Sequence, residues 1–298
     1  MVEEIDILKE SRSDWGGPWT EQKLNTFSRY VRAYLTIMKK RPYWQTIYFD
    51  GFAGSGNRKE DCNSMLFKQL KISDEEEHIY RGSAERVLTL GKDFDFDFYY
   101  FIDTNKSSLS TLEKKLETIP GISEKIVSYK HGDCNKYIFE LAKALHTNKY
   151  AALVLLDPFG MQINWDAVAS LSNTRSDLWI LVPTGLIVNR LLDRNGELTH
   201  IDKLQSFLGL SEEEIRSAFY NQCIEKTLFG DEKVTTKILK PIDNIARLYI
   251  RQLKTVWKYV SENPLILKNS RGVALFHFIF ATNNLSALKI ASQIIKSR

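Results

Sequence analysis

The sequence predicts an α/β fold in which a mostly parallel sheet carries helices on both faces and ends in an antiparallel strand. Four short segments rich in β-branched and aromatic residues lie in the first half of the chain, and each runs into an acidic residue. Helical patterns precede the first segment and follow it. Near the carboxyl end, two apolar segments separated by Ser-Arg-Gly are typical of an antiparallel hairpin. Strands that alternate with helices indicate a parallel sheet.

The first element is expected to be a helix that packs on the sheet. It is preceded by a tail that contains Trp15 and suggests a docking strand or loop. Thr20 is the predicted N-cap of the helix, and Pro42 ends it. Between them, apolar residues recur at three- and four-residue spacing: Leu24, Phe27, Val31, Tyr34, Leu35 and Met38.

The first strand leads into a glycine-rich turn, TIYFDGFAGSG (residues 46–56). Asp50 falls at the carboxyl end of the strand, and Gly51, Gly54 and Gly56 allow the backbone to approach a ligand closely. The glycine spacing matches neither G-x-G-x-x-G nor G-x-x-x-x-G-K-[ST], so a pyrophosphate cradle is disfavoured. An acid before the turn would repel phosphate but can hold an ammonium group or an ordered water.

Three more predicted strands also run into acids. The segments are FDFYYFIDTN (96–105), SYKHGDC (128–134) and AALVLLDPFG (151–160). Their acids are Asp103, Asp133 and Asp157. In an open α/β sheet, ligands bind outside the carboxyl ends of the strands, so these acids and Asp50 are expected to face one cleft. The alternative for each residue alone is a helix cap or the start of a turn.

The four acids and the glycine turn predict a pocket for S-adenosylmethionine. Asp50 suits the ammonium of its amino-acid end, Asp103 can accept both ribose hydroxyls, and Asp133 can accept the adenine amino group. The expected cofactor contacts are Asp50, Gly51, Phe52, Ala53, Gly54, Gly56, Asp103, Asp133 and Cys134. Cys134 either touches adenine or is a buried structural thiol.

DGFAGSG, FIDTN, GDCN and LLDPFG resemble, in this order, motifs I to IV of class I S-adenosylmethionine-dependent methyltransferases. Most of the chain is similar to the bacterial and phage-associated family called three-Cys-motif partner proteins, including WTEQKL (19–24), RGSAERVL (81–88) and FHFIFATNNLSALKI (276–290). The resemblance implies a Rossmann-like class I methyltransferase fold, S-adenosylmethionine as cofactor, and a partner with a three-cysteine, radical-SAM-like motif. D-x-F-A-G-x-G also occurs in cytosine-C5 DNA methyltransferases, but this chain lacks their Pro-Cys dipeptide.

Asp157, Pro158, Phe159 and Gly160 form the predicted catalytic loop. It resembles the Asp/Asn-Pro-Pro-Tyr/Phe loop of amino-methyltransferases and, more closely, the loop of tRNA guanine-N2 dimethyltransferases, although the second proline is missing. A carboxylate and a proline-fixed carbonyl can accept hydrogen bonds from an exocyclic amino group and stabilise positive charge in the transition state. Phe159 can stack on a base, a contact worth about 1–3 kcal/mol. The alternative is an Asp-Pro turn with Phe159 packed inward.

The net charge of +4 does not by itself indicate nucleic acid. Basic residues cluster on two predicted helices: Arg29, Arg32, Lys39, Lys40 and Arg41 on the first, and Arg247, Arg251, Lys254 and Lys258 near the carboxyl end. On the second helix, Arg251 and Lys254 are the predicted contacts to the phosphates of an RNA or DNA substrate. The alternative is a solvated helix face, where charge normally lies.

A cofactor-binding core with additions is the expected organisation of the chain. Its parts are a tail and helix (1–45), the core (46–185) with a lid-like insertion (57–80), a helical insertion (186–262), and the closing strands and last helix of the core (263–298). In the helical insertion, Ser211 and Glu214 form a capping box that opens a helix. By fold analogy, this insertion binds the substrate or the partner.

The composition indicates a cytoplasmic enzyme. The 298 residues, 43% of them hydrophobic, can bury a sizeable core, and no apolar run approaches the roughly 18 residues of a membrane span. The start MVEEIDILKE is acidic where a signal peptide is basic. Cys62, Cys134 and Cys223 include no C-x-x-C, and the five histidines have no metal-ligand spacing, so neither a disulfide framework nor a structural metal is expected.

Three hypotheses follow for the function. The first is an S-adenosylmethionine-dependent N-methyltransferase that acts on an exocyclic amino group of a nucleobase in RNA or DNA. The second keeps the cofactor and changes the acceptor to a protein or a small molecule. The third is a non-catalytic partner or binding module that retains the fold. A nicotinamide-dependent reductase is disfavoured by the glycine spacing.

Overall fold

The structure of the chain is a computed structural model, and the part it describes comprises residues 17–54, 82–91, 93–147, 149–158, 160–190, 192, 196, 198, 200–227, 230–238, 241–269 and 272–297. Most of the predicted tail, the lid-like insertion at 57–80, Gly56 and Phe159 therefore lie outside the described residues. Among the described residues, no helix combines the length and the apolar character needed to cross a membrane.

The central sheet has eight strands in the order β3-β2-β1-β4-β5-β10-β8, with β9 also paired to β10. Five strands are parallel: β1 (Gln45–Asp50), β2 (Phe98–Asp103), β3 (Val127–His131), β4 (Tyr150–Leu156) and β5 (Ser176–Val182). Beyond β5, β10 (Ala274–Thr282) pairs antiparallel with β5, and β8 (Tyr259–Val260) and β9 (Leu265–Lys268) each pair antiparallel with β10. The order of the first five is that of a doubly wound α/β sheet. The predicted mostly parallel sheet with an antiparallel closure is confirmed.

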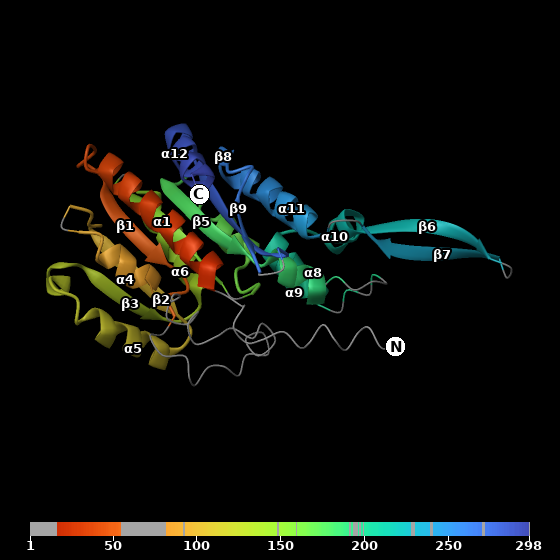
Figure 1. Ribbon diagram of the computed structural model, residues 1–298, viewed down its shortest axis with the longest axis horizontal. Coiled ribbons are helices and arrows are strands. Elements are labelled where there is room, and N and C mark those ends of the chain that lie inside the picture. Colours follow the sequence, from red (N-terminus) through yellow and green to blue (C-terminus); the bar gives the residue numbers. More distant parts are fainter. Residues whose placement is uncertain are drawn as a thin grey trace.

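Helices cover both faces of the sheet (Figure 1). One face carries α1 (Gly17–Met38), α4 (Gly82–Leu88), α5 (Lys106–Leu116) and α12 (Leu285–Lys296). The other carries α6 (Cys134–Leu145), α7 (Trp165–Ala169), α8 (Thr184–Arg190), α9 (Ile201–Leu208), α10 (Glu212–Phe219) and α11 (Pro241–Val256). Side chains alternate across each strand, so Ile47 and Phe49 join one core while Tyr48 joins the other.

The first helix packs on the sheet as predicted, but it begins earlier. α1 starts at Gly17, so Thr20 lies inside the helix and is not its N-cap. Phe27 and Tyr30 pack with Trp179 of β5, with ring centroids 6.4 and 5.5 Å from it. Aromatic pairs at these separations contribute beyond simple burial, so α1 is an integral part of this core.

The region 186–262 is only partly helical, which corrects the prediction of a helical insertion. The capping box of Ser211 and Glu214 does open α10, but the helix ends at Phe219 and the chain turns into an antiparallel hairpin. Its strands, β6 (Tyr220–Thr227) and β7 (Gly230–Lys237), project from one end of the molecule (Figure 1). Both strands carry β-branched residues, among them Ile224, Val234, Thr235 and Thr236, which favour a ribbon over a helix.

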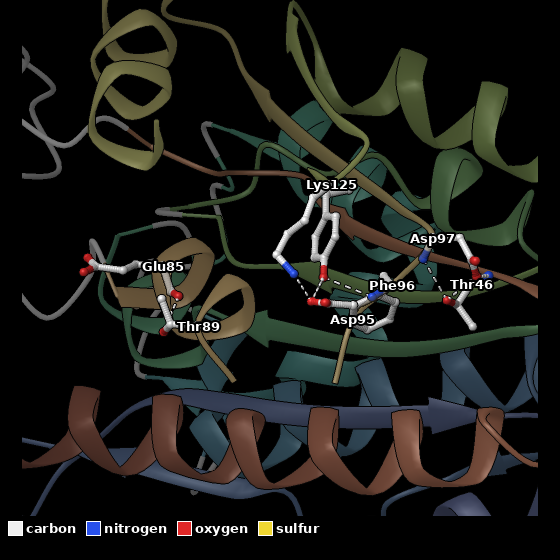
Figure 2. A network of polar contacts seen from close by, with 8 residues as sticks. Thr46, Glu85, Thr89, Asp95, Phe96, Asp97 and Lys125 are labelled. Atoms are coloured by element: carbon white, nitrogen blue, oxygen red, sulfur yellow. Dashed lines mark hydrogen bonds and ion pairs between the residues drawn. The ribbon is translucent and has the colours of Figure 1, made fainter. Parts of the chain in front are cut away.

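A polar network joins the loops at the amino ends of the first three strands (Figure 2). Asp97 accepts hydrogen bonds from the backbone N–H and the hydroxyl of Thr46, at 2.6 and 2.8 Å. Asp95 accepts one from the hydroxyl of Tyr99 and forms an ion pair with Lys125. Because the strands are parallel, this network lies at the edge of the sheet opposite the predicted cleft. We interpret it as a structural network that holds these loops together.

Candidate functional site

The four predicted acids lie at the carboxyl ends of four neighbouring parallel strands. Asp50 is the last residue of β1, Asp103 is the last residue of β2, and Asp157 directly follows β4. Asp133 comes two residues after β3 and directly precedes α6. Because these strands are adjacent in the order β3-β2-β1-β4, the acids are distributed along one edge of the sheet.

The glycine turn after β1 is tied to the end of β2. The backbone N–H of Gly54 donates to Asp103 Oδ2 at 2.9 Å, and that of Ala53 donates to the carbonyl of Ile102 at 2.9 Å. The other oxygen of Asp103 accepts from the N–H of Asn105 at 2.7 Å. Gly54 has a positive φ of 70°, and a Cβ placed there would meet no atom of the described residues within 4 Å. The turn therefore has glycine geometry, and no described residue crowds its outer position.

Gly51 and Cys134 face each other behind this turn. A Cβ on Gly51 would lie 2.4 Å from Cys134 Sγ and 2.8 Å from a methyl of Leu156, so the position admits only glycine. Cys134 is buried, and burial together with the charges of Asp133 and Asp50 raises the pKa of its thiol. These contacts favour the interpretation of Cys134 as a structural thiol, while its contact with adenine stays a prediction.

Asp133 is the N-cap of α6, and a helix cap was the alternative role considered for this residue from the sequence. Its side chain accepts from the backbone N–H of Asn135 at 3.0 Å, and α6 begins at the next residue. Asn135 in turn donates to the carbonyl of Gln162 and accepts from the N–H of Asn164, both at 2.8 Å. The start of α6 is thus joined to the chain that follows the predicted catalytic loop. Asn135 was not singled out in the sequence.

Asp50 is completely buried and surrounded by neutral donors. Its oxygens accept from the backbone N–H of Phe52 at 3.2 Å, the hydroxyl of Tyr48 at 3.2 Å, and the hydroxyl of Ser83 on α4 at 3.4 Å. Burial raises the pKa of Asp50 to about 7, and the negative charge of Asp157 adds to the effect, whereas the hydrogen bonds oppose it. The carboxyl group therefore changes its protonation near neutral pH.

Asp157 forms a buried ion pair with Lys23 of α1. The Nζ of Lys23 lies 2.5 Å from Asp157 Oδ2, and the two residues are only 2% and 5% exposed. Lys23 was not among the residues predicted for the site. A signal was present, because Lys23, Phe27 and Tyr30 follow the i, i+4, i+7 spacing of one helix face, and that face is buried.

The rest of the predicted catalytic loop is held close to the sheet. Pro158 and Gly160 are buried, and the N–H of Gly160 donates to Oε1 of Gln162 at 2.9 Å. The stacking predicted for Phe159 falls outside the described residues. Asp157, Pro158 and Gly160 thus sit at the carboxyl end of β4, beside the end of β1.

Arg251 and Lys254 lie on another part of the molecule. Both are exposed on α11, which packs against α8, α10, β8 and β10 beyond β5. Lys254 forms an ion pair of 2.9 Å with Glu262. The structure therefore places the predicted phosphate contacts on the half of the sheet that lies away from the four acids. Their role in substrate binding stays a prediction.

Comparisons with known proteins do not identify a family. No family model matches the chain, and no curated protein matches it. Among solved structures, one similar chain is protein LPL1258 from Legionella pneumophila str. Philadelphia 1, described under the family model DUF519. It is 11% identical with a TM-score of 0.34, and the match covers 78% of this chain and 92% of that one. A likeness of this size carries no functional argument.

Proposed function

We propose that this chain is an S-adenosylmethionine-dependent N-methyltransferase with a Rossmann-like class I fold. Its acceptor is an exocyclic amino group of a nucleobase in RNA or DNA, and it works with a three-cysteine-motif, radical-SAM-like partner, as its resemblance to three-Cys-motif partner proteins implies. The observation that carries the proposal is the placement of Asp50, Asp103 and Asp157 at neighbouring strand ends around a glycine turn. Ligands of open α/β sheets bind at this edge.

The residues of the turn fit the cofactor. No described residue lies within 4 Å of the position of a Cβ on Gly54, so in the described part of the chain the backbone is accessible where a ligand would approach. The carboxylate of Asp103 is partly exposed beside this position, and hydrogen bonds from Gly54 and Asn105 fix its orientation. Such a fixed acceptor suits vicinal ribose hydroxyls. Asp50 supplies a buried carboxyl at the opposite side of the turn.

The residues after β4 suit an amino group. The carboxylate of Asp157 and the carbonyl of Pro158 are acceptors held on the end of a rigid strand, which satisfies the positioning that methyl transfer to nitrogen requires. S-adenosylmethionine would supply the methyl group. The role of Asp157 is to orient the amine and to stabilise the positive charge that develops on its nitrogen.

Calorimetric titration with S-adenosylmethionine and S-adenosylhomocysteine tests the cofactor, with NAD as the negative control. We expect micromolar binding of the first two and loss of at least tenfold in affinity on Asp103→Ala, because one charge-assisted hydrogen bond contributes at least 1.4 kcal/mol, which is about tenfold. Asp93→Ala is the matched control, since Asp93 is an exposed carboxylate paired only across the surface with Lys39. Equal binding by the Asp103 variant would refute the assignment of Asp103.

Transfer of a labelled methyl group to total RNA, to DNA and to protein tests the acceptor. We expect label in a nucleic acid with the wild-type protein and none with Asp157→Ala. The double substitution Arg251→Ala/Lys254→Ala should weaken nucleic-acid binding and reduce its salt slope if α11 contacts phosphates.

A protein or small-molecule acceptor is the second candidate. The observation that favours it is the position of Arg251 and Lys254 away from the four acids, together with the engagement of Lys254 by Glu262. Label that enters protein, with no change on Arg251→Ala/Lys254→Ala, would establish it. If Asp157→Ala leaves the cellular phenotype intact and Asp50→Ala removes it, the chain is instead a non-catalytic partner.

A further inference from the structure

The ion pair between Lys23 and Asp157 lies in an environment where charge is costly. Both residues are almost fully buried, and their charged atoms are 2.5 Å apart. Asp50, also buried, is close enough for the charge of Asp157 to raise its pKa. Two carboxyl groups in one buried site cannot both stay ionised without a neighbouring cation. Lys23 is a cation in direct contact with one of these acids, Asp157.

The helix that carries Lys23 is fixed on both sides of it. Arg86 of α4 donates to Asn25 at 2.9 Å and to Glu21 at 2.7 Å. These two contacts bind the first turns of α1 to α4. Two turns further on, the hydroxyl of Tyr30 donates to half-buried Asp177 at 2.6 Å. Lys23 therefore reaches Asp157 from a rigid element, which is how functional carboxylates are held in a productive orientation.

We propose that Lys23 is a positioning residue that acts through Asp157: its ammonium keeps the buried carboxylate ionised and directs it toward the amino group of the acceptor. This inference rests on the proposed function for the identity of the acceptor. It makes α1 a part of the reaction site rather than only a packing helix. A carboxylic acid in place of the carboxylate would lose half of its accepting capacity and the charge that stabilises the transition state.

Carbon-13 NMR of the protein labelled at the aspartate carboxyl carbons tests the role of Lys23 without any activity. Asp157→Asn identifies the signal of Asp157 by its loss. At pH 7, we expect this signal at the position of an ionised carboxylate in the wild type and in Lys23→Arg, and at the position of a carboxylic acid in Lys23→Met. An ionised signal in Lys23→Met would overturn the inference, and so would a protonated signal in the wild type.

The rate of methyl transfer then tests whether the reaction depends on the negative charge of Asp157. We expect Lys23→Met to lower kcat about 100-fold or more while the affinity for S-adenosylhomocysteine stays within twofold, because the loss concerns transition-state charge. The acidic limb of its pH profile should move to higher pH, and Lys23→Arg should restore most of kcat. Lys39→Met is the matched control, because Lys39 directly follows the end of α1 and forms an exposed pair with Asp93. Lys39→Met should change neither kcat nor the affinity for S-adenosylhomocysteine.

The two measurements separate the failure of this inference from the failure of the proposed function. If the wild type transfers no methyl group to any acceptor, the proposed function fails, and the carboxyl signals still decide whether Lys23 controls the ionisation of Asp157. If the wild type is active and Lys23→Met retains full kcat with an unchanged pH profile, the positioning role is wrong and the methyltransferase proposal stands.

Discussion

Lys23 and Tyr30 lie two turns apart on one face of α1, and each reaches a carboxylate in or directly after a strand of the sheet. Lys23 binds Asp157 after β4, and Tyr30 binds Asp177 in β5, where Thr282 of β10 also donates. The helix is therefore joined by polar side chains to the end of β4 and to β5, and through Asp177 to β10. Polar contacts of this kind favour one arrangement of an element, because another arrangement would lose these hydrogen bonds.

Removal of the Lys23 ammonium should destabilise the protein. Lys23→Met removes the ion pair with the buried carboxylate of Asp157, and we expect a loss of about 3–5 kcal/mol in the free energy of unfolding, measured by urea at pH 7. Adding Asp157→Asn should recover much of this loss, because the uncompensated charge is gone. Lys39→Met should change stability by less than about 1 kcal/mol, since its pair is exposed. Additive effects of the two substitutions at Lys23 and Asp157 would contradict the pairing.

Tyr30→Phe should weaken the second attachment of α1. It removes the hydroxyl that donates to Asp177, which retains the hydrogen bond from Thr282. We expect a cost of about 1–3 kcal/mol, because a charge-assisted bond is lost in a buried site. Burial raises the pKa of Asp177 and the bond from Tyr30 lowers it, so the variant should also raise that pKa further. Unfolding curves would measure the loss of stability. A pKa of Asp177 that is the same in the wild type and in Tyr30→Phe would contradict the prediction.

The strands were predictable because each carries its own local signal. β1, β2, β4, β5 and β10 are short runs dominated by aliphatic and aromatic residues, and an acid at or directly after the end of the first three marks their carboxyl ends. The hairpin β6–β7 was missed because the capping box at Ser211 and Glu214 gives a strong helix signal that lasts only to Phe219. Local helix propensity does not indicate the residue at which that helix ends.

The candidate site was predictable only in part. Asp50, Asp103 and Asp157 follow from strand order, which a sequence can show. The pairing of Lys23 with Asp157 joins residues 134 positions apart, and nothing near Lys23 in the chain specifies its partner. The same holds for Cys134 behind Gly51, where the sequence shows a glycine but not the sulfur atom that requires it. Contacts between distant segments depend on packing, which periodicity does not encode.

Gly51 should tolerate no side chain, in part because any Cβ at this position would clash with the sulfur atom of Cys134. In Gly51→Ala the new Cβ would lie 2.4 Å from Sγ, so we expect a loss of about 1–3 kcal/mol from overpacking. Cys134→Ala in the same chain should relieve part of this loss, seen as a favourable interaction energy in a double-mutant cycle. Gly54→Ala is the control, because its cost of about 1–2 kcal/mol arises from a positive φ and should not respond to Cys134→Ala.

Asp50 should make stability depend on pH. Its pKa in the folded protein is raised to about 7, against about 3.9 in an unfolded chain, so between these values the folded state holds a proton that the unfolded state has released. Stability is therefore expected to fall as the pH rises from about 4 to 7 and to level off above 7. The full effect corresponds to about 4 kcal/mol.

Asp50→Asn isolates this dependence from other groups. Burial lowers the pKa of His277 to about 4, and this group has the opposite effect, because the unfolded state takes up its proton first as the pH falls below about 6.5. The difference between the unfolding free energies of the wild type and Asp50→Asn cancels the contribution of His277. We expect the variant to gain stability relative to the wild type between pH 5 and pH 8, as measured by urea. A difference that is constant over this interval would mean that Asp50 stays in one protonation state, and the site would then hold a fixed charge rather than a group that titrates near neutral pH.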